Sequence, residues 1–392
     1  PNRVIASSPR FEPYMESFAD WVISHRKILL VGSSSAALFL MAIAPLNVIS
    51  DQFSKYFAEG TPIRTDTDFT DQNLGGLYSI EYSLDTKNSQ GVTDPEYLMT
   101  VEKFAEWYRQ QPKVSHVNTY TDIVKQLNQR LNEDHPGYYT LPESKELSAQ
   151  YLLLYELSLP LGLDLSNMLS FDKSASRMIV SFPSLKTYEF IEIQENAKSW
   201  LKQNAPDLLQ EGSALSLMFT HIGLRSMIGG VKGAFIALLL ITLALMISFR
   251  SAKMGLISVL PNLLPGATGF GVWYLLSGEI GFSFAMVLGI TMGIVVDDTV
   301  HFLTKYLRAR ETRSSEDAVR YAFSSVGVAL VITTLVLVVG FSMLGISDFK
   351  MNSDPGVMVG IVITIALIFD FLLLPPLLIT FDRFIYRQAN TG

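Results

Sequence analysis

The sequence has 392 residues, of which 49% are hydrophobic and only 17% are charged, whereas a soluble protein of this size usually carries about 25% charged residues. It contains no cysteine, which excludes a disulfide framework and a thiolate metal site. Outside residues 50–225 the charged residues fall mostly in short clusters between long apolar runs. The basic residues form no nucleic-acid footprint, so no nucleic-acid partner is expected.

The chain begins with a polar stretch, residues 1–25, ahead of its first apolar run. That run is too long and too far from the start for a cleavable signal peptide. About 20 apolar residues in a helix cross ~30 Å of hydrocarbon. Residues 28–49 are therefore predicted to be the first membrane span, and residues 1–27 a polar N-terminal segment or linker before it.

A polar, acidic region covers residues 50–225 and carries 15 Lys and Arg against 24 Asp and Glu residues. Its periodicity predicts a small α/β domain of the split βαβ type. The expected elements are a strand at 77–84, a helix at 94–111, a strand at 114–119, helices at 121–131 and 146–159, a strand at 177–182 and a helix at 188–204.

This α/β region has no catalytic motif, no His pair and no Gly-rich phosphate loop, so no metal or other cofactor is expected and an enzyme is the least favoured class. If the domain gathers an apolar ligand, it needs a cleft lined by aliphatic and aromatic side chains. Tyr151, Leu154 and Tyr155 are candidates for substrate contact there. The alternative for this Leu-rich helix is plain core.

Residues 226–382 are predicted to hold five more spans, at 229–249, 255–276, 281–303, 326–344 and 357–379, with a short amphipathic helix at 316–323 and a tail at 383–392. Lys and Arg near span ends stay on the cytoplasmic side. Of the short loops, residues 277–280 contain no basic residue and residues 345–356 contain only Lys350. The basic clusters near the span ends fall on the other side: Arg26, Lys27, Arg250, Lys253, Lys305, Arg308, Arg310, Arg313, Arg320, Arg383 and Arg387. Both termini are therefore predicted to be cytoplasmic in a bacterial inner membrane, with residues 50–225 periplasmic.

Three carboxylates lie inside the predicted spans, where an ionised carboxylate costs about 2.5–3.5 kcal/mol on insertion scales. Span four carries Asp297, Asp298 and His301, and span six carries Asp370. Close carboxylates in low dielectric cannot all ionise, so at least one is expected to be protonated at neutral pH in some state. This set of four is the predicted proton relay. The alternatives are that the aspartates only hydrogen-bond helices together, and that His301 only orients the pair.

Smaller signals indicate a packed, moving bundle. Asn262 is a polar amide between two prolines, and such breaks are tolerated where neighbouring helices satisfy the backbone. Thr333 and Thr334 are candidates to hydrogen-bond the carboxylates, and the alternative for each is a hydrogen bond within its own helix. Four glycines are expected to permit close helix contact: Gly289, Gly293, Gly340 and Gly360.

These motifs together resemble the resistance-nodulation-division transporters. Gly293-Ile-Val-Val-Asp-Asp298 is similar to their proton-relay motif, and Leu260-Pro-Asn-Leu-Leu-Pro265 to their third-span element. Thr333–Phe341 and Asp370–Pro375 resemble their fifth and sixth spans. A half-molecule in that superfamily also has this order of elements, with one span first, then a large outer domain and then five spans.

The small outer domain is similar to the lipid-exporter branch, which includes mycobacterial membrane-protein-large, hopanoid-exporter and Patched-like members. The resemblance implies proton-coupled export of a hydrophobic or lipid-like molecule, with membrane lipids and protons as partners. It also implies a missing second half, this chain being the C-terminal one, and a periplasmic or outer-membrane partner protein. Two rivals remain open: a protein-translocation accessory of the secretion-associated branch, and a non-transporting lipid sensor of the sterol-sensing type.

Overall fold

The computed structural model describes residues 12–160 and 165–386. The chain divides into two compact units. The first, here called the helical unit, contains residues 1–49 and 223–392; the second, the sheet unit, is Ser50–Ile222. Most of the predicted C-terminal tail, with Arg387, lies outside the described residues, as do residues 1–11 of the predicted N-terminal segment.

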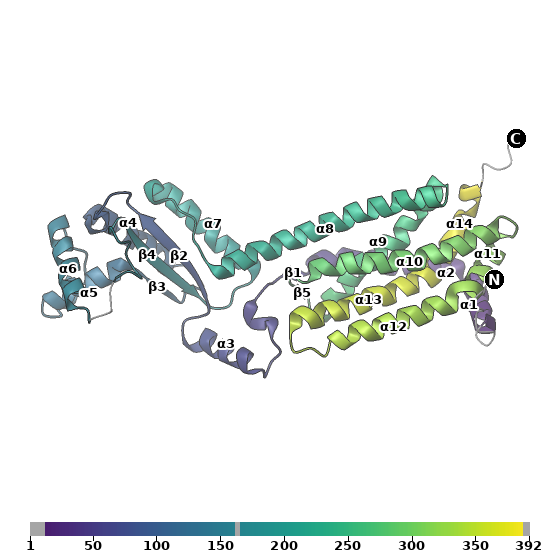
Figure 1. The fold of residues 1–392 in the computed structure, drawn as a ribbon, viewed down its shortest axis with the longest axis horizontal. Helices are drawn as coiled ribbons and strands as arrows, with labels where there is room; N and C mark the ends of the chain where they lie inside the picture. The colour runs from purple at the N-terminus through teal and green to yellow at the C-terminus, as the bar shows by residue number, and fades with distance from the viewer. Residues whose placement is uncertain (1–11, 161–164, 387–392) are drawn as a thin grey trace, which may run out of the picture. The chain divides into compact units, whose positions relative to one another are not determined.

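The helical unit is built from long apolar helices (Figure 1). Six helical segments in the described part of the chain are long and apolar enough to cross a membrane, which confirms the predicted number of spans. The elements in chain order are α1 (Glu12–Ser24), α2 (Arg26–Ile43), β1 (Val48–Ile49), α8 (Leu215–Ser248), α9 (Ala252–Leu276), β5 (Glu279–Ile280), α10 (Phe284–Arg310), α11 (Ser315–Ala322), α12 (Val328–Leu344), α13 (Lys350–Leu372) and α14 (Leu374–Tyr386). A 3-10 turn (Ala44–Leu46) follows α2, and a π-helical turn (Phe323–Gly327) joins α11 to α12.

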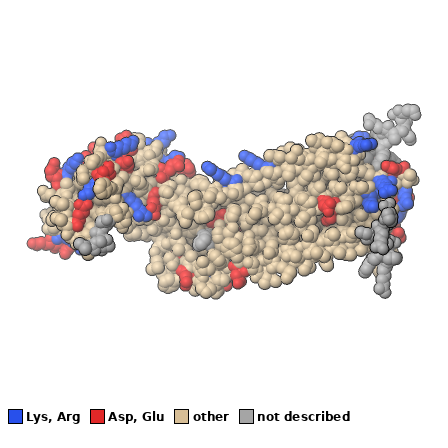
Figure 2. All heavy atoms as spheres, in the orientation of Figure 1, with Lys and Arg blue, Asp and Glu red and all other residues tan. Residues whose placement is uncertain are grey.

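Helix α13 is the centre of this unit and packs against α9, α10 and α12, while α2 packs against α9. The span that contains α13 is 61% buried, whereas the span that contains α2 is only 6% buried and presents its apolar side chains outward. Lys and Arg gather at the end that holds α1 and α11, and the flank between the ends is largely uncharged (Figure 2). A helix bundle with an apolar flank and polar ends matches the cross-section of a bilayer.

The glycine that allows the closest helix approach is one that the sequence reasoning overlooked. A Cβ on Gly271 would lie 2.1 Å from the Leu40 carbonyl oxygen, so only glycine lets α9 approach α2 this closely. By contrast, a Cβ on Gly289, Gly293 or Gly340 would meet no atom of the described chain within 4 Å.

The segment before the first span differs from the polar linker that was expected. Residues Glu12–Ser24 form α1, and its apolar positions Ala19 and Val22 are fully buried against the end of the bundle. The spacing of apolar side chains at Phe18, Ala19 and Val22 gives the helix one apolar face, which explains the docking.

Two further helices differ from the prediction in where they begin or end. The predicted surface helix near α11 exists, but Ala318, Val319 and Ala322 bury its apolar face and the π-helical turn continues it into α12. The sixth span is interrupted at Leu373. Pro375 and Pro376 follow at once, and a proline lacks the N–H that would continue the preceding helix.

The sheet unit has a three-stranded antiparallel sheet in the order β2–β4–β3. Strands β2 and β3 both run antiparallel to β4 and therefore parallel to each other, so β2–α4–β3 is a βαβ unit split by β4. The described elements are a 3-10 turn (Phe53–Tyr56), α3 (Pro62–Asn73), β2 (Tyr78–Asp85), a 3-10 turn (Gly91–Thr93), α4 (Pro95–Arg109), β3 (His116–Asn118), α5 (Tyr120–Leu131), a 3-10 turn (Pro136–Tyr138), α6 (Lys145–Ser158), β4 (Ala175–Phe182), α7 (Thr187–Asn204) and a 3-10 turn (Pro206–Leu208).

One face of this sheet forms the core of the unit. Alternate residues of β2, such as Ile80 and Tyr82, are buried, and their register partners Val180 and Met178 on β4 are buried with them. This alternation is the one expected of a strand with one covered face. The helix α3 is the element that the periodicity did not indicate.

Candidate functional site

Two carboxyl groups lie in the interior of the helical unit. Asp370 on α13 is 1% exposed and Asp298 on α10 is 7% exposed. The Thr299 hydroxyl donates a hydrogen bond to the Asp370 Oδ1 atom over 3.0 Å, which joins α10 to α13. The two carboxyls are close enough for their charges to interact. Within the described residues, the Asp370 Oδ2 atom has no hydrogen-bond partner.

Helix periodicity explains why α10 directs Asp298 and Thr299 inward. The buried residues Thr291, Val295 and Phe302 lie on the same face as this pair, at spacings of three and four. The polar pair therefore stands in the middle of an otherwise apolar buried stripe. A stripe of this kind would ordinarily be filled by aliphatic residues, since a buried polar group without a partner is destabilising.

Asp297 and His301 do not join this buried pair. Their side chains are 72% and 59% exposed, and the His301 Nε2 atom lies 3.4 Å from the Asp297 Oδ1 atom. Neighbouring residues of a helix are about 100° apart, so Asp297 cannot point the way that Asp298 points. The four residues of the predicted relay are thus divided into a buried pair on two helices and an exposed pair on α10.

The predicted supporting residues are also divided. Asn262 and Thr334 are buried, and no described residue hydrogen-bonds the Asn262 amide or the Thr334 hydroxyl. Thr333 donates to the Ala329 carbonyl of its own helix, which is the alternative that the sequence left open for it. Thr299 donates to a carboxylate instead, and the sequence reasoning missed it. Its signal was its place directly after Asp298, four residues beyond Val295 on the inner face.

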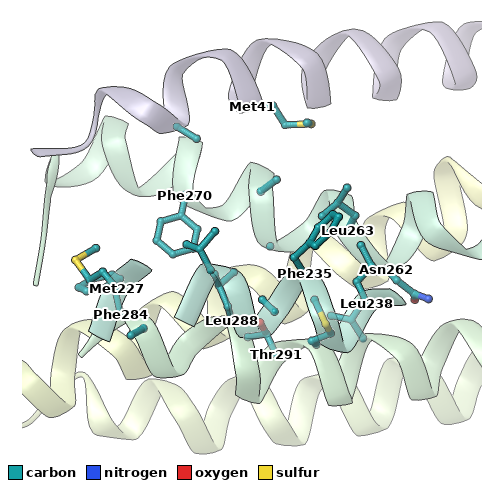
Figure 3. A pocket seen from close by; sticks show the side chains of 18 of the residues that line it. Met41, Met227, Phe235, Leu238, Asn262, Leu263, Phe270, Phe284, Leu288 and Thr291 are labelled. Atoms are coloured by element: carbon teal, nitrogen blue, oxygen red, sulfur yellow. The ribbon is translucent and has the colours of Figure 1, made fainter. Parts of the chain in front are cut away.

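An apolar cavity of about 490 Å³ lies between α2, α8, α9 and α10. Figure 3 shows side chains from these helices around it, among them Met41, Phe235, Phe270 and Leu288. Nearly all of its lining is apolar, with Asn262 and Thr291 as polar exceptions. A volume of roughly 300–1,000 Å³ with few polar groups is the usual character of a small-molecule site.

The cavity and the carboxyl pair share α10. Val295 lines the cavity and Asp298 follows three residues later. A rise of ~1.5 Å per residue puts them ~4.5 Å apart along the helix axis. A movement of α10 at the carboxyl pair would therefore displace the wall of the cavity.

The candidate substrate contacts of the sheet unit have different surroundings. Tyr151 is buried in the core and its hydroxyl donates to the Asn128 side-chain oxygen over 2.8 Å. Tyr155 is partly buried against the same core, and Leu154 is 49% exposed. The plain-core alternative thus describes Tyr151, while Leu154 is at the surface.

Comparisons with known proteins agree with the membrane architecture. The family model described as "MMPL family" matches residues 72–390. The chain is similar to a solved structure of the hedgehog release protein Disp from the water bear Hypsibius dujardini, with 12% identity and a TM-score of 0.56. The match covers 93% of this chain and 49% of the Disp chain, so this chain spans about half the length of that protein. No curated protein matches the sequence.

Proposed function

The chain belongs to the MMPL family, and we propose that the protein containing it is a proton-driven exporter of hydrophobic or lipid-like molecules. The observation that carries this proposal is the buried pair Asp298 and Asp370 on two adjacent spans. Carboxyl groups within a membrane are costly, and when retained they commonly mark ion or proton paths.

Protons act on this pair by changing its charge. In a low dielectric the pair cannot hold two charges without a large energetic penalty. Binding or release of a proton therefore changes the free energy of packing between α10 and α13. One elementary charge that crosses 100 mV supplies ~2.3 kcal/mol. That energy biases a bundle whose two arrangements differ by a few kcal/mol.

The substrate side of the proposal rests on the apolar cavity beside α10. Its lining suits an acyl chain or a fused-ring hydrocarbon, and Asn262 offers one amide to a polar head. Because Val295 and Asp298 lie on the same helix face, protonation and the shape of the cavity are coupled in this proposal.

We further propose the topology that the basic residues indicate, with both termini cytoplasmic, the sheet unit periplasmic and a bacterial inner membrane as the location. This chain would be the C-terminal half of a transporter. Asp297 and His301, exposed on α10, would then face the other half.

The test is proton-dependent transport by the full-length protein in proteoliposomes with a pH-sensitive dye inside. Asp298→Asn and Asp370→Asn keep the side-chain shape but cannot titrate, so each should abolish proton movement while folding and insertion remain intact. Asp348→Asn is the matched control, because Asp348 is an exposed carboxylate outside the bundle core.

Growth complementation at equal expression supplies a second measurement. His301→Ala should be milder than Asp298→Asn, because the histidine lies on the exposed face. Full activity of the Asp298→Asn, Asp370→Asn double variant would refute the proton relay and favour the lipid-sensor alternative.

A further inference from the structure

A polar pocket lies at the junction of α1 and α2, away from the carboxyl pair. It has a volume of about 520 Å³ and is lined by residues 23–28 of the chain and by Glu316 of α11. We refer to it as the junction pocket. Its lining combines three basic or titratable side chains, His25, Arg26 and Lys27, with the apolar side chain of Ile28.

The junction is held in place by contacts on both sides. The buried face of α1 is anchored by Val22, and the Arg320 guanidinium pairs with Asp20 over 2.6 Å. On the other side, Arg26 pairs with Glu316 over 2.5 Å. The basic side chains of the pocket are therefore presented from a fixed backbone.

The polar wall of the pocket has unused hydrogen-bonding capacity. Lys27 is exposed and has no ion-pair partner within the described ranges. His25 Nδ1 lies 3.0 Å from the Trp21 carbonyl oxygen and 2.9 Å from the Ser24 hydroxyl. A carbonyl oxygen can only accept, so the bond to Trp21 requires the proton on Nδ1 and leaves the Nε2 atom for a ligand.

The apolar wall continues along the membrane-spanning helix. Ile28 is 72% exposed and Val31, one turn further along α2, is 66% exposed. Trp21 is 46% exposed, and its ring centroid lies 5.2 Å from that of the His25 imidazole. Tryptophan is enriched at the level of lipid headgroups, because its amphipathic ring suits the boundary between the hydrocarbon core and water.

We propose that the junction pocket binds an anionic phospholipid, with its phosphate at Lys27 and Arg26 and an acyl chain along Ile28 and Val31. The cations supply charge complementarity to a phosphate. The exposed side chains of Ile28 and Val31 favour a lipid over inorganic phosphate, because phosphate has no apolar part to bury against them. The pocket lies at the end of the bundle, where the headgroups of one leaflet would stand.

The experiment measures the thermal stability of the full-length protein in detergent, titrated with phosphatidylglycerol, phosphatidylcholine or inorganic phosphate. Phosphatidylglycerol should stabilise the protein at lower concentration than phosphatidylcholine. Lys27→Gln should raise its half-saturating concentration roughly fivefold, the usual contribution of one lysine near an anionic lipid surface. Ile28→Asn should weaken the effect of phosphatidylglycerol and leave any effect of inorganic phosphate unchanged.

The matched control is Arg308→Gln, an exposed basic residue near the same end of the bundle but outside the pocket. Equal responses to the two lipids would overturn the proposal, as would equal losses in Lys27→Gln and Arg308→Gln. Saturation by inorganic phosphate at the concentration that suffices for phosphatidylglycerol, with Ile28→Asn unaffected, would show a free-phosphate site instead.

Discussion

Replacing Thr299 with valine tests the join between α10 and α13 directly. Thr299 is fully buried and donates the one hydrogen bond that Asp370 receives from the described residues. Valine has nearly the same volume, so packing is retained while the hydroxyl is lost. A buried hydrogen bond to a carboxyl group contributes about 1–3 kcal/mol.

That energy sets the size of the expected effect. A change of about 1–3 kcal/mol corresponds to roughly 5- to 150-fold in the population of the arrangement in which the two helices are joined. Proton flux into proteoliposomes that contain the full-length protein should fall within this range for Thr299→Val. Thr299→Ser keeps the hydroxyl and should retain most of the flux.

Thr364→Val is the matched control, because the Thr364 hydroxyl on α13 donates to the Gly360 carbonyl of its own helix. Its removal should leave proton flux close to that of the unmodified protein. The reasoning fails if Thr299→Val and Thr364→Val transport equally well while Asp370→Asn is inactive, because the carboxyl would then act without its partner on α10.

Three further predictions concern other parts of the chain. A reporter fused at Gln90 should be periplasmic and one at Thr312 cytoplasmic; finding both on one side would contradict the proposed topology. Ala267→Trp should fill much of the apolar cavity and inhibit transport of a lipid probe with little change in melting temperature, whereas uninhibited transport would exclude the cavity from the path. Burial raises the pKa of Tyr82 and Tyr97 from the ordinary value of 10 to about 12. The stability that the two buried neutral hydroxyls contribute is therefore complete below pH 10 and is lost as the pH rises towards 12. Ultraviolet titration that shows every tyrosine ionising near pH 10 in the folded protein would disprove this.

Local pattern was sufficient for the element types. Membrane spans are long apolar runs, so composition alone predicted six of them, and strict alternation predicted β2 and β4. The residues of the split βαβ unit were likewise visible, because one covered sheet face demands a period of two. Helix ends were harder: α8 begins at Leu215, well before the predicted start of its span, because no proline interrupts residues 215–228 and the single glycine there, Gly223, does not end the helix.

The composition of the site came from the sequence, but its grouping came from packing. The sequence identified Asp297, Asp298 and Asp370 as costly groups in a membrane. It could not determine which of them share an interior, since that depends on how far each helix is rotated about its axis and on which helix lies beside it. Packing of α10 against α13 buried Asp298 and brought Thr299 to Asp370, and the same rotation left Asp297 exposed.

The cavity and the junction pocket depend still more on tertiary structure. Met41, Phe235 and Phe270 are ordinary apolar residues of three separate spans, and nothing in their local pattern predicts a shared void. The docking of α1 follows from contacts between residues about 300 positions apart, such as Asp20 with Arg320. Hydropathy and periodicity report on neighbours along the chain, whereas a cavity or an ion pair between distant segments is decided only when the helices pack.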